Sequence, residues 1–262
     1  MITAGVDMGA KTIKIVLFKD GKIIGKNIIL GGFDQRAAAE KAFHELLTQT
    51  KRTRNEIEHI SVTGMGRKEI YLHPPISADH EVTEVTADAR GTLYLHPSAR
   101  TIIDVGAEEG RGIKCDANGK VVDFAVNEKC AAGAGSFTEA MGRALEVKVE
   151  DLGDLSLKST NAVAMNAQCA VFAESEVVSL IHAKTAKQDI ARAIHDAIAN
   201  RIVSMARRIG VEKDVVLIGG ISKNKGFVDS LKRILEIDNL LIPAEAEYVG
   251  AIGAAIIASE NR

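Results

Sequence analysis

Three loops in this sequence carry residues that could bind parts of a nucleotide, and the first interrupts the N-terminal apolar stretch. Residues 7–12 read DMGAKT, with an acid placed where a strand would end. The Asp7 carboxylate suits Mg²⁺, which proteins usually hold with one or two carboxylates together with phosphate oxygens. Small residues after it would let backbone N–H groups approach a phosphate, and the two polar residues could add a donor. The candidate phosphate-binding residues are Gly9, Ala10, Lys11 and Thr12.

A second acid lies at the end of another apolar run, residues 101–105. There Asp104 is followed by Gly106 and Ala107, so this loop repeats the Asp-x-Gly pattern of the first. A Mg²⁺ ion held by one carboxylate would be completed by a second, and Asp104 is the candidate for it.

The third loop follows a β-branched run at residues 214–218 and begins with Gly219 and Gly220. A flat adenine or a ribose could lie against the bare backbone of two adjacent glycines. Taken alone, each of the three loops is explained equally well by an ordinary tight turn. Their order along the chain favours a nucleotide site.

The elements that must position these loops alternate between strands and helices. The spacing of apolar residues predicts strands over 2–17 (broken by the first loop), from 22, and over 59–63, with a helix over 35–50. Further strands are expected within 101–126, at 214–218 and at 240–242, and helices over 135–145, 160–180, 186–209, 227–235 and 249–258. This alternation predicts an α/β protein with two covered sheets. The repeated Asp-x-Gly hairpin indicates an internal duplication, although two unrelated hairpins would also account for it.

Composition excludes several classes of function. The net charge is -2 and the chain has no Trp, so there is no basic, aromatic surface for nucleic acid. No apolar run approaches the roughly 20 residues that span a bilayer. The N-terminus lacks a secretory signal, so we expect a cytoplasmic protein. Three cysteines do not form a disulfide framework in that compartment, which leaves metal binding or burial for them.

The motifs occur in the order strand–DxG, strand–DxG and strand–GG, followed by a closing helix of small residues. In this order the chain resembles the superfamily of actin, Hsp70 and sugar kinases. The resemblance covers essentially the whole chain and implies two duplicated ribonuclease-H-like domains that close on ATP. It implies a first domain over residues 1–95, with the final helix (249–262) returning to it, and a second domain over 96–248. It assigns to the adenosine loop Gly219, Gly220, Lys223 and Asn224.

Two of the cysteines lie where helices are expected to begin. Cys130 lies within NEKCAAGAGSF and Cys169 opens CAVFAESEV. A helix N-terminus favours a thiolate, and its N–H groups can bond cluster sulfides. Each cysteine alone is more often a small buried residue; Cys115, outside both segments, is interpreted as structural.

Both segments resemble the cysteine motifs of the ATPase and iron–sulfur activators of 2-hydroxyacyl-CoA dehydratases and benzoyl-CoA reductase. The resemblance implies that Cys130 and Cys169 are half of the ligands of one [4Fe–4S] cluster, shared with a second subunit. A region of helices would carry this cluster.

The second loop departs from the DxGGQDSK pattern of that family and reads DVGAEEGR. This variant resembles the D-type ATPase subunit of benzoyl-CoA reductase, which implies a heterodimer with a homologous ATPase subunit. It further implies catalytic subunits that reduce an aromatic acyl-CoA and ferredoxin as electron donor. Asp7 and Asp104 would then position Mg²⁺ and water, assisted by Glu108 or Glu109.

Three alternatives remain open at this stage. The chain could be the homodimeric activator of a 2-hydroxyacyl-CoA dehydratase. It could be a small-molecule kinase of the same superfamily, although 262 residues leave little room for a substrate-binding insert. It could also be a regulatory subunit that binds ATP without hydrolysing it, because Glu108 adds a negative charge where the γ-phosphate is expected.

Overall fold

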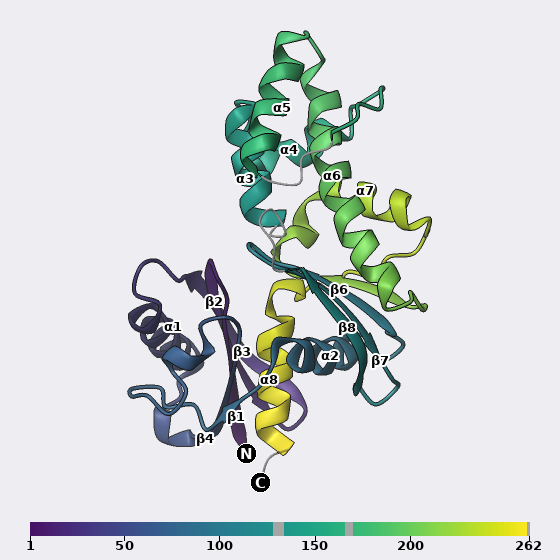
Figure 1. The fold of residues 1–262 in the computed structure, drawn as a ribbon. Coiled ribbons are helices and arrows are strands. Elements are labelled where there is room, and N and C mark those ends of the chain that lie inside the picture. The colour runs from purple at the N-terminus through teal and green to yellow at the C-terminus, as the bar shows by residue number, and fades with distance from the viewer. Residues whose placement is uncertain (128–133, 166–169, 261–262) are drawn as a thin grey trace. The chain divides into compact units, whose positions relative to one another are not determined.

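The computed structural model describes residues 1–127, 134–165 and 170–260. The chain divides into two compact units (Figure 1). The first unit contains residues 1–102, 115–122 and 243–262, and the second contains residues 103–114 and 123–242.

The first sheet has the strand order β3-β2-β1-β4-β5. Its strands are β1 (Ile2–Met8), β2 (Thr12–Lys19), β3 (Lys22–Leu30), β4 (Ile57–Thr63) and β5 (His80–Glu81). The first three form an antiparallel meander, and β4 runs parallel to β1. Asp20 and Gly21 both have positive φ in the turn between β2 and β3, as tight hairpins require. The predicted order of β1 to β4 is confirmed, and β5 was not expected.

Helix α1 (Gln35–Thr50) lies over this sheet and follows the prediction at both ends. Its N-cap, Asp34, accepts a hydrogen bond from the Ala37 backbone N–H, which satisfies a donor that the first turn leaves without a helical partner. Lys51 ends the helix in the left-handed conformation. The buried face is built from Ala39, Ala42, Phe43, Leu46 and Leu47.

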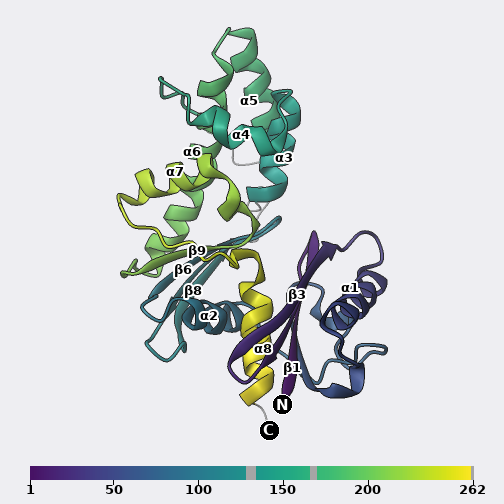
Figure 2. The ribbon, with the colours of Figure 1, turned by 180° about the vertical axis from the view of Figure 1, so that it is seen from behind.

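Helix α8 (Val249–Glu260) packs against β1 and against α2 (Glu84–Leu95), as Figure 2 shows. Small residues allow this close approach: a Cβ at Gly5 would overlap backbone atoms of α8, and one at Gly253 would overlap the Ala87 carbonyl. Helix α8 confirms the predicted closing helix. No helix was expected at α2, whose contact face consists of small residues without a strong apolar period.

The second sheet has the order β8-β7-β6-β9. Its strands are β6 (Thr101–Val105), β7 (Gly110–Cys115), β8 (Val121–Asn127) and β9 (Val215–Ile218). The strand expected at 240–242 is reduced to one parallel bridge between Leu241 and Val216. The sheet therefore ends at β9 with a single backbone bridge beyond it.

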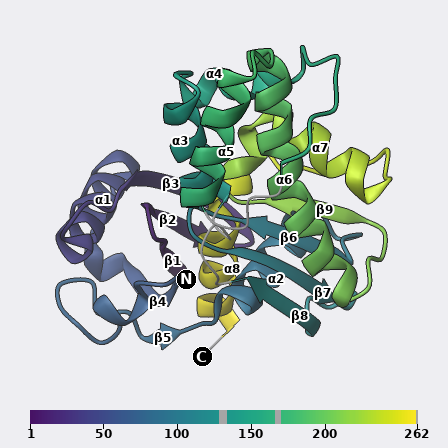
Figure 3. The ribbon, with the colours of Figure 1, turned by 45° about the horizontal axis from the view of Figure 1, so that its top comes forward.

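The second unit is rich in helices, and α3, α4 and α5 gather around one end of α6 (Figure 3). The helices are α3 (Ala134–Ala144), α4 (Val149–Ser156), α5 (Ala170–His182), α6 (Lys187–Arg208) and α7 (Lys225–Leu235). Short 3-10 helices occur in the chain at Arg54–Glu56, Arg67–Glu69, Gly220–Lys223 and Ala246–Tyr248. The core among these helices includes Phe137, Met141, Ile194, Ile198 and Phe227.

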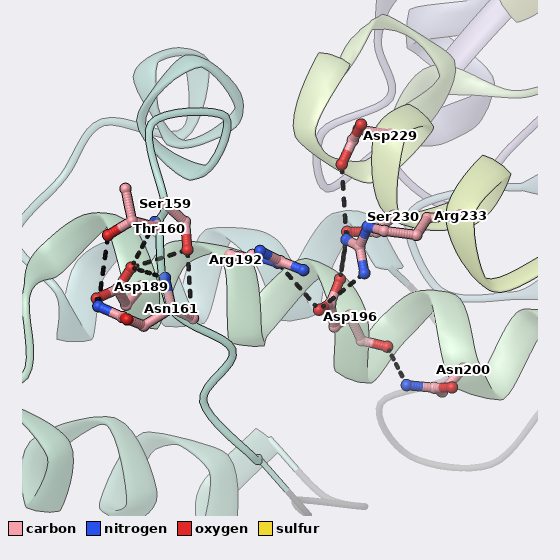
Figure 4. A network of polar contacts seen from close by, with 10 residues as sticks. All are labelled: Ser159, Thr160, Asn161, Asp189, Arg192, Asp196, Asn200, Asp229, Ser230 and Arg233. Atoms are coloured by element: carbon pink, nitrogen blue, oxygen red, sulfur yellow. Dashed lines mark hydrogen bonds and ion pairs between the residues drawn. The ribbon is translucent and has the colours of Figure 1, made fainter.

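The helix predicted over 160–180 is wrong at its start, because residues 160–165 are not helical. Asp189 of α6 accepts hydrogen bonds from the Ser159 hydroxyl and from the backbone N–H groups of Thr160 and Asn161 (Figure 4). These bonds lower the pKa of the Asp189 carboxyl, with the Ser159 bond as the largest cause. A carboxylate distant in sequence thus holds residues 159–161 in the non-helical segment that follows α4.

Candidate functional site

The first candidate loop follows β1, and its carboxylate is already paired. Asp7 lies opposite Lys14 in the register of β1 and β2, and the Lys14 Nζ lies 3.0 Å from Asp7 Oδ2. The Asp7 side chain is 16% exposed and that of Lys14 is 15% exposed. Gly9, Ala10 and Thr12 are half-buried, while Lys11 is exposed. The loop therefore presents accessible backbone beside a partly buried ion pair.

Other segments of the first unit approach this loop closely at glycines. The Gly66 N–H donates to the Met8 carbonyl at 2.9 Å. At Gly64, whose φ is +91°, a Cβ would lie 2.6 Å from Asp7 Oδ1. The Gln35 amide lies 3.5 Å from the Gly9 and Ala10 carbonyl oxygens. Accessible backbone N–H groups can bind phosphate oxygens, and a carboxylate can bind Mg²⁺. This loop has both kinds of group.

The second candidate loop, between β6 and β7, is organised by a buried arginine. Arg111 is 7% exposed and Asp104 is 8% exposed. The Arg111 Nη1 lies 2.6 Å from Asp104 Oδ2, and its Nη2 is paired with Glu109 Oε2. The Gly106 N–H donates to the Glu109 carbonyl at 2.9 Å, which closes the loop. Gly106 and Ala107 are half-buried, and Glu108 is exposed.

The two loops share a feature that the sequence interpretation missed. In each, the carboxylate pairs through Oδ2 with a cation seven residues later, on the strand that follows: Lys14 for Asp7 and Arg111 for Asp104. The repeated seven-residue spacing was visible in the sequence. Its meaning needed the strand register, which brings the two side chains together.

The third candidate loop meets the second at one glycine. Gly219 has a φ of +88°, and a Cβ there would overlap the Val105 carbonyl and lie 2.7 Å from Asp104 Oδ1. The structure therefore brings Gly219 together with the second loop. Gly220 and Lys223 are exposed. The Asn224 side chain caps α7 by accepting from the Phe227 N–H at 3.0 Å, so this oxygen already has a structural role.

Cys130 and Cys169 lie outside the described residues. The helices that follow them in sequence, α3 and α5, begin at Ala134 and Ala170. The N-terminus of α3 is bonded to the second loop: Gly135 N–H donates to the Gly106 carbonyl at 3.2 Å, and Ser136 N–H donates to the Ala107 carbonyl at 3.0 Å.

Cys115 has the features of a structural residue. It is 2% exposed, and its thiol lies 3.8 Å from the Ala99 carbonyl oxygen. Burial raises the pKa of the Cys115 thiol to about 11. A thiol that resists deprotonation is a poor metal ligand.

Comparison with known proteins decides the family. Residues 4–258 match the BadF/BadG/BcrA/BcrD ATPase family. The chain belongs to this family. The (R)-2-hydroxyglutaryl-CoA dehydratase activating ATPase of Acidaminococcus fermentans is 37% identical, over 98% of this chain and 96% of that protein. The 2-hydroxyisocaproyl-CoA dehydratase activator of Clostridioides difficile is 35% identical, over 100% and 96%. The D-type benzoyl-CoA reductase subunit of Thauera aromatica is 30% identical, over 97% and 92%.

Solved structures agree with this membership. Component A of the A. fermentans (R)-2-hydroxyglutaryl-CoA dehydratase superposes with a TM-score of 0.93 at 35% identity, covering 99% of this chain and 98% of that one. The activator of the 2-hydroxyisocaproyl-CoA dehydratase from Clostridium difficile, solved with bound ADPNP, gives 0.91 at 35% identity, covering 99% and 95%. The chain has the α/β fold of actin-like ATPases, as its order of loops implies.

No helix of the described residues has both the length and the apolar character needed to cross a membrane.

Proposed function

We propose that this chain is an ATP-hydrolysing activator that delivers low-potential electrons to a partner acting on an acyl-CoA. Its membership of an ATPase family with dehydratase activators at 35–37% identity carries the proposal. The electrons would pass through a [4Fe–4S] cluster, and ferredoxin would supply them.

The described residues fit ATP and Mg²⁺. Asp7 and Asp104 supply two carboxylates at strand ends, each next to half-buried glycine backbone that can approach phosphate oxygens. Binding of a nucleotide analogue by the C. difficile activator supports this assignment. In this proposal, Asp7 and Asp104 would each serve in positioning Mg²⁺ and water, and the exposed Glu108, or Glu109, would assist.

Cys130 and Cys169 are the proposed cluster ligands. A [4Fe–4S] cluster is held by four thiolates, so two chains with two cysteines each complete one ligand set. The buried, protonated Cys115 is not expected to take part. The cluster would therefore require a dimer.

Of the two partner systems, we favour the 2-hydroxyacyl-CoA dehydratase, with the chain as a homodimer. The dehydratase activators are 35% and 37% identical, and the benzoyl-CoA reductase subunit is 30% identical. The sequence at Glu108 and Glu109 favours the second candidate, a heterodimer in an ATP-dependent benzoyl-CoA reductase. The two systems differ in whether a homologous ATPase chain accompanies this one.

The test is anaerobic purification from cells that make the protein, followed by native mass measurement and iron and sulfide analysis. Two copies of the 28.0 kDa chain with about four iron atoms per dimer would support the homodimeric activator. A co-purifying homologous chain would support the reductase. Replacing both Cys130 and Cys169 by Ala should remove the iron, and Cys115→Ala should retain it. Iron retained by the double variant would overturn the cluster assignment.

Hydrolysis is tested separately with Glu108→Gln. If Glu108 impairs the native site, ATP turnover should rise in this variant, and the regulatory subunit becomes the better assignment. A native chain that already hydrolyses ATP and loses turnover in Asp104→Asn supports the activator.

A further inference from the structure

Arg111 is a buried cation that holds two carboxylates of the second loop. Its Nη1 lies 2.6 Å from Asp104 Oδ2, and its Nη2 is paired with Glu109 Oε2. Its side chain is 9% exposed, against 11% for Asp104 and 18% for Glu109. A guanidinium is planar and always charged, so its donors fix the direction of both carboxylates as well as offsetting their charge.

The first loop repeats this device in the other unit. Lys14 lies 3.0 Å from Asp7 Oδ2, again seven residues after the acid and on the following strand. A single buried ion pair could be explained by packing alone. The same kind of ion pair occurs at the matching position of both loops, which indicates that the cation acts on the carboxylate of its loop.

We propose that Arg111 is a positioning residue of the nucleotide site, which orients Asp104 and offsets part of the negative charge of the second loop for an anionic ligand. This rests on the proposed function, because it assumes that the loop meets ATP. The loop carries three acids, Asp104, Glu108 and Glu109, and the triphosphate adds more negative charge. With Arg111 in place, the loop tolerates the phosphates and leaves Asp104 able to share Mg²⁺ with them.

The charge argument gives effects of opposite sign for two variants. Arg111→Met should weaken ATP binding without Mg²⁺ and lower the Mg²⁺ concentration needed for half-maximal binding. Each effect should be about tenfold or more, as one unit charge gives at an effective dielectric constant of about 20. Glu109→Gln removes a negative charge and should raise the Mg²⁺ requirement. If the Arg111–Glu109 ion pair were only structural, both variants would weaken ATP binding and would change the Mg²⁺ requirement in the same direction.

The measurement is calorimetric titration of the anaerobic, cluster-containing protein with ATP over a series of Mg²⁺ concentrations. Arg111→Lys keeps the positive charge but lacks the planar guanidinium, so it should recover most of the charge effect on both constants. The difference that remains from wild type measures what the orientation of Asp104 contributes. Lys114→Met is the matched control, since Lys114 lies on the same strand and pairs with Glu212. It should leave both constants unchanged.

Constants for folded Arg111→Met equal to those of Lys114→Met would overturn the proposal. If Arg111→Met does not fold, an unchanged or lowered Mg²⁺ requirement in Glu109→Gln overturns it equally. A wild-type chain that binds no ATP at all would instead refute the proposed function.

Discussion

The buried histidine of α6 should make the second unit sensitive to acid. His195 is fully buried, and burial lowers its pKa to about 4, against the smaller opposing effect of the Asp196 carboxylate. The unfolded chain has a histidine pKa of about 6.5. Above pH 6.5 the His195 ring is neutral in both the folded and the unfolded state, so its protonation costs the folded state no stability. As the pH falls below 6.5, only the unfolded state takes up a proton, so stability is lost until about pH 4.

The magnitude follows from the two pKa values. The free energy of unfolding should fall by about 1.3 kcal/mol between pH 7.5 and 5.5, and by about 2.5 kcal/mol by pH 4.5. His195→Gln removes the titrating group, so the difference between wild type and variant isolates this one residue from every carboxylate that titrates in the same range.

Hydrogen exchange of α6 peptides, corrected for intrinsic exchange rates, is the suitable assay. The chain has no Trp, and Tyr71, Tyr94 and Tyr248 all lie in the first unit, so fluorescence would not report the second. The reasoning is refuted if the protection difference between wild type and His195→Gln stays constant from pH 7.5 to 4.5.

Three further predictions concern stability and thiol chemistry. Gly253→Ala should destabilise the protein by about 3 kcal/mol or more, because its Cβ would overlap the Ala87 carbonyl. Differential scanning calorimetry measures this loss, with Ser259→Ala, at a half-exposed position of the same helix, as the control. Asp189→Asn should lower the melting temperature and speed amide exchange at Thr160 and Asn161, whose N–H groups donate to Asp189; unchanged exchange there would contradict the bonding described. Cys115 should react with iodoacetamide far more slowly than a free thiol at pH 8, because its pKa is about 11, as mass spectrometry of the native and unfolded protein can establish.

Local patterns predicted those parts of the fold that local interactions determine. Helix α1 follows prediction because its N-cap and its apolar spacing are both local. Residues 160–165 do not follow prediction. Asp189 of another helix holds Thr160 and Asn161 in this non-helical segment, and no local pattern identifies it as their partner. Helix α2 was missed because its packing depends on small residues such as Gly91, which a pattern of large apolar residues does not register.

The candidate site divides in the same way. The acids and glycines of the loops can be found from their types and spacing. The cations that pair with the acids could not be assigned, because Lys14 and Arg111 reach Asp7 and Asp104 only through strand pairing. Likewise, the close approach of the Asp104 carboxylate to Gly219 could not be predicted from the sequence. The role of Gly219 in binding adenosine stays a prediction.

The two backbone bonds that join α3 to the second loop would pass a displacement of that loop on to the helix. The Gly135 and Ser136 N–H groups donate to the Gly106 and Ala107 carbonyls. A Cβ at Gly135 would lie 2.9 Å from Ala107 Cα, so the first turn of α3 packs tightly against the loop. Helix α3 is 11 residues long, or about 16 Å at 1.5 Å per residue. A tilt of roughly 10° about its N-terminal end would therefore move its C-terminal end by about 3 Å.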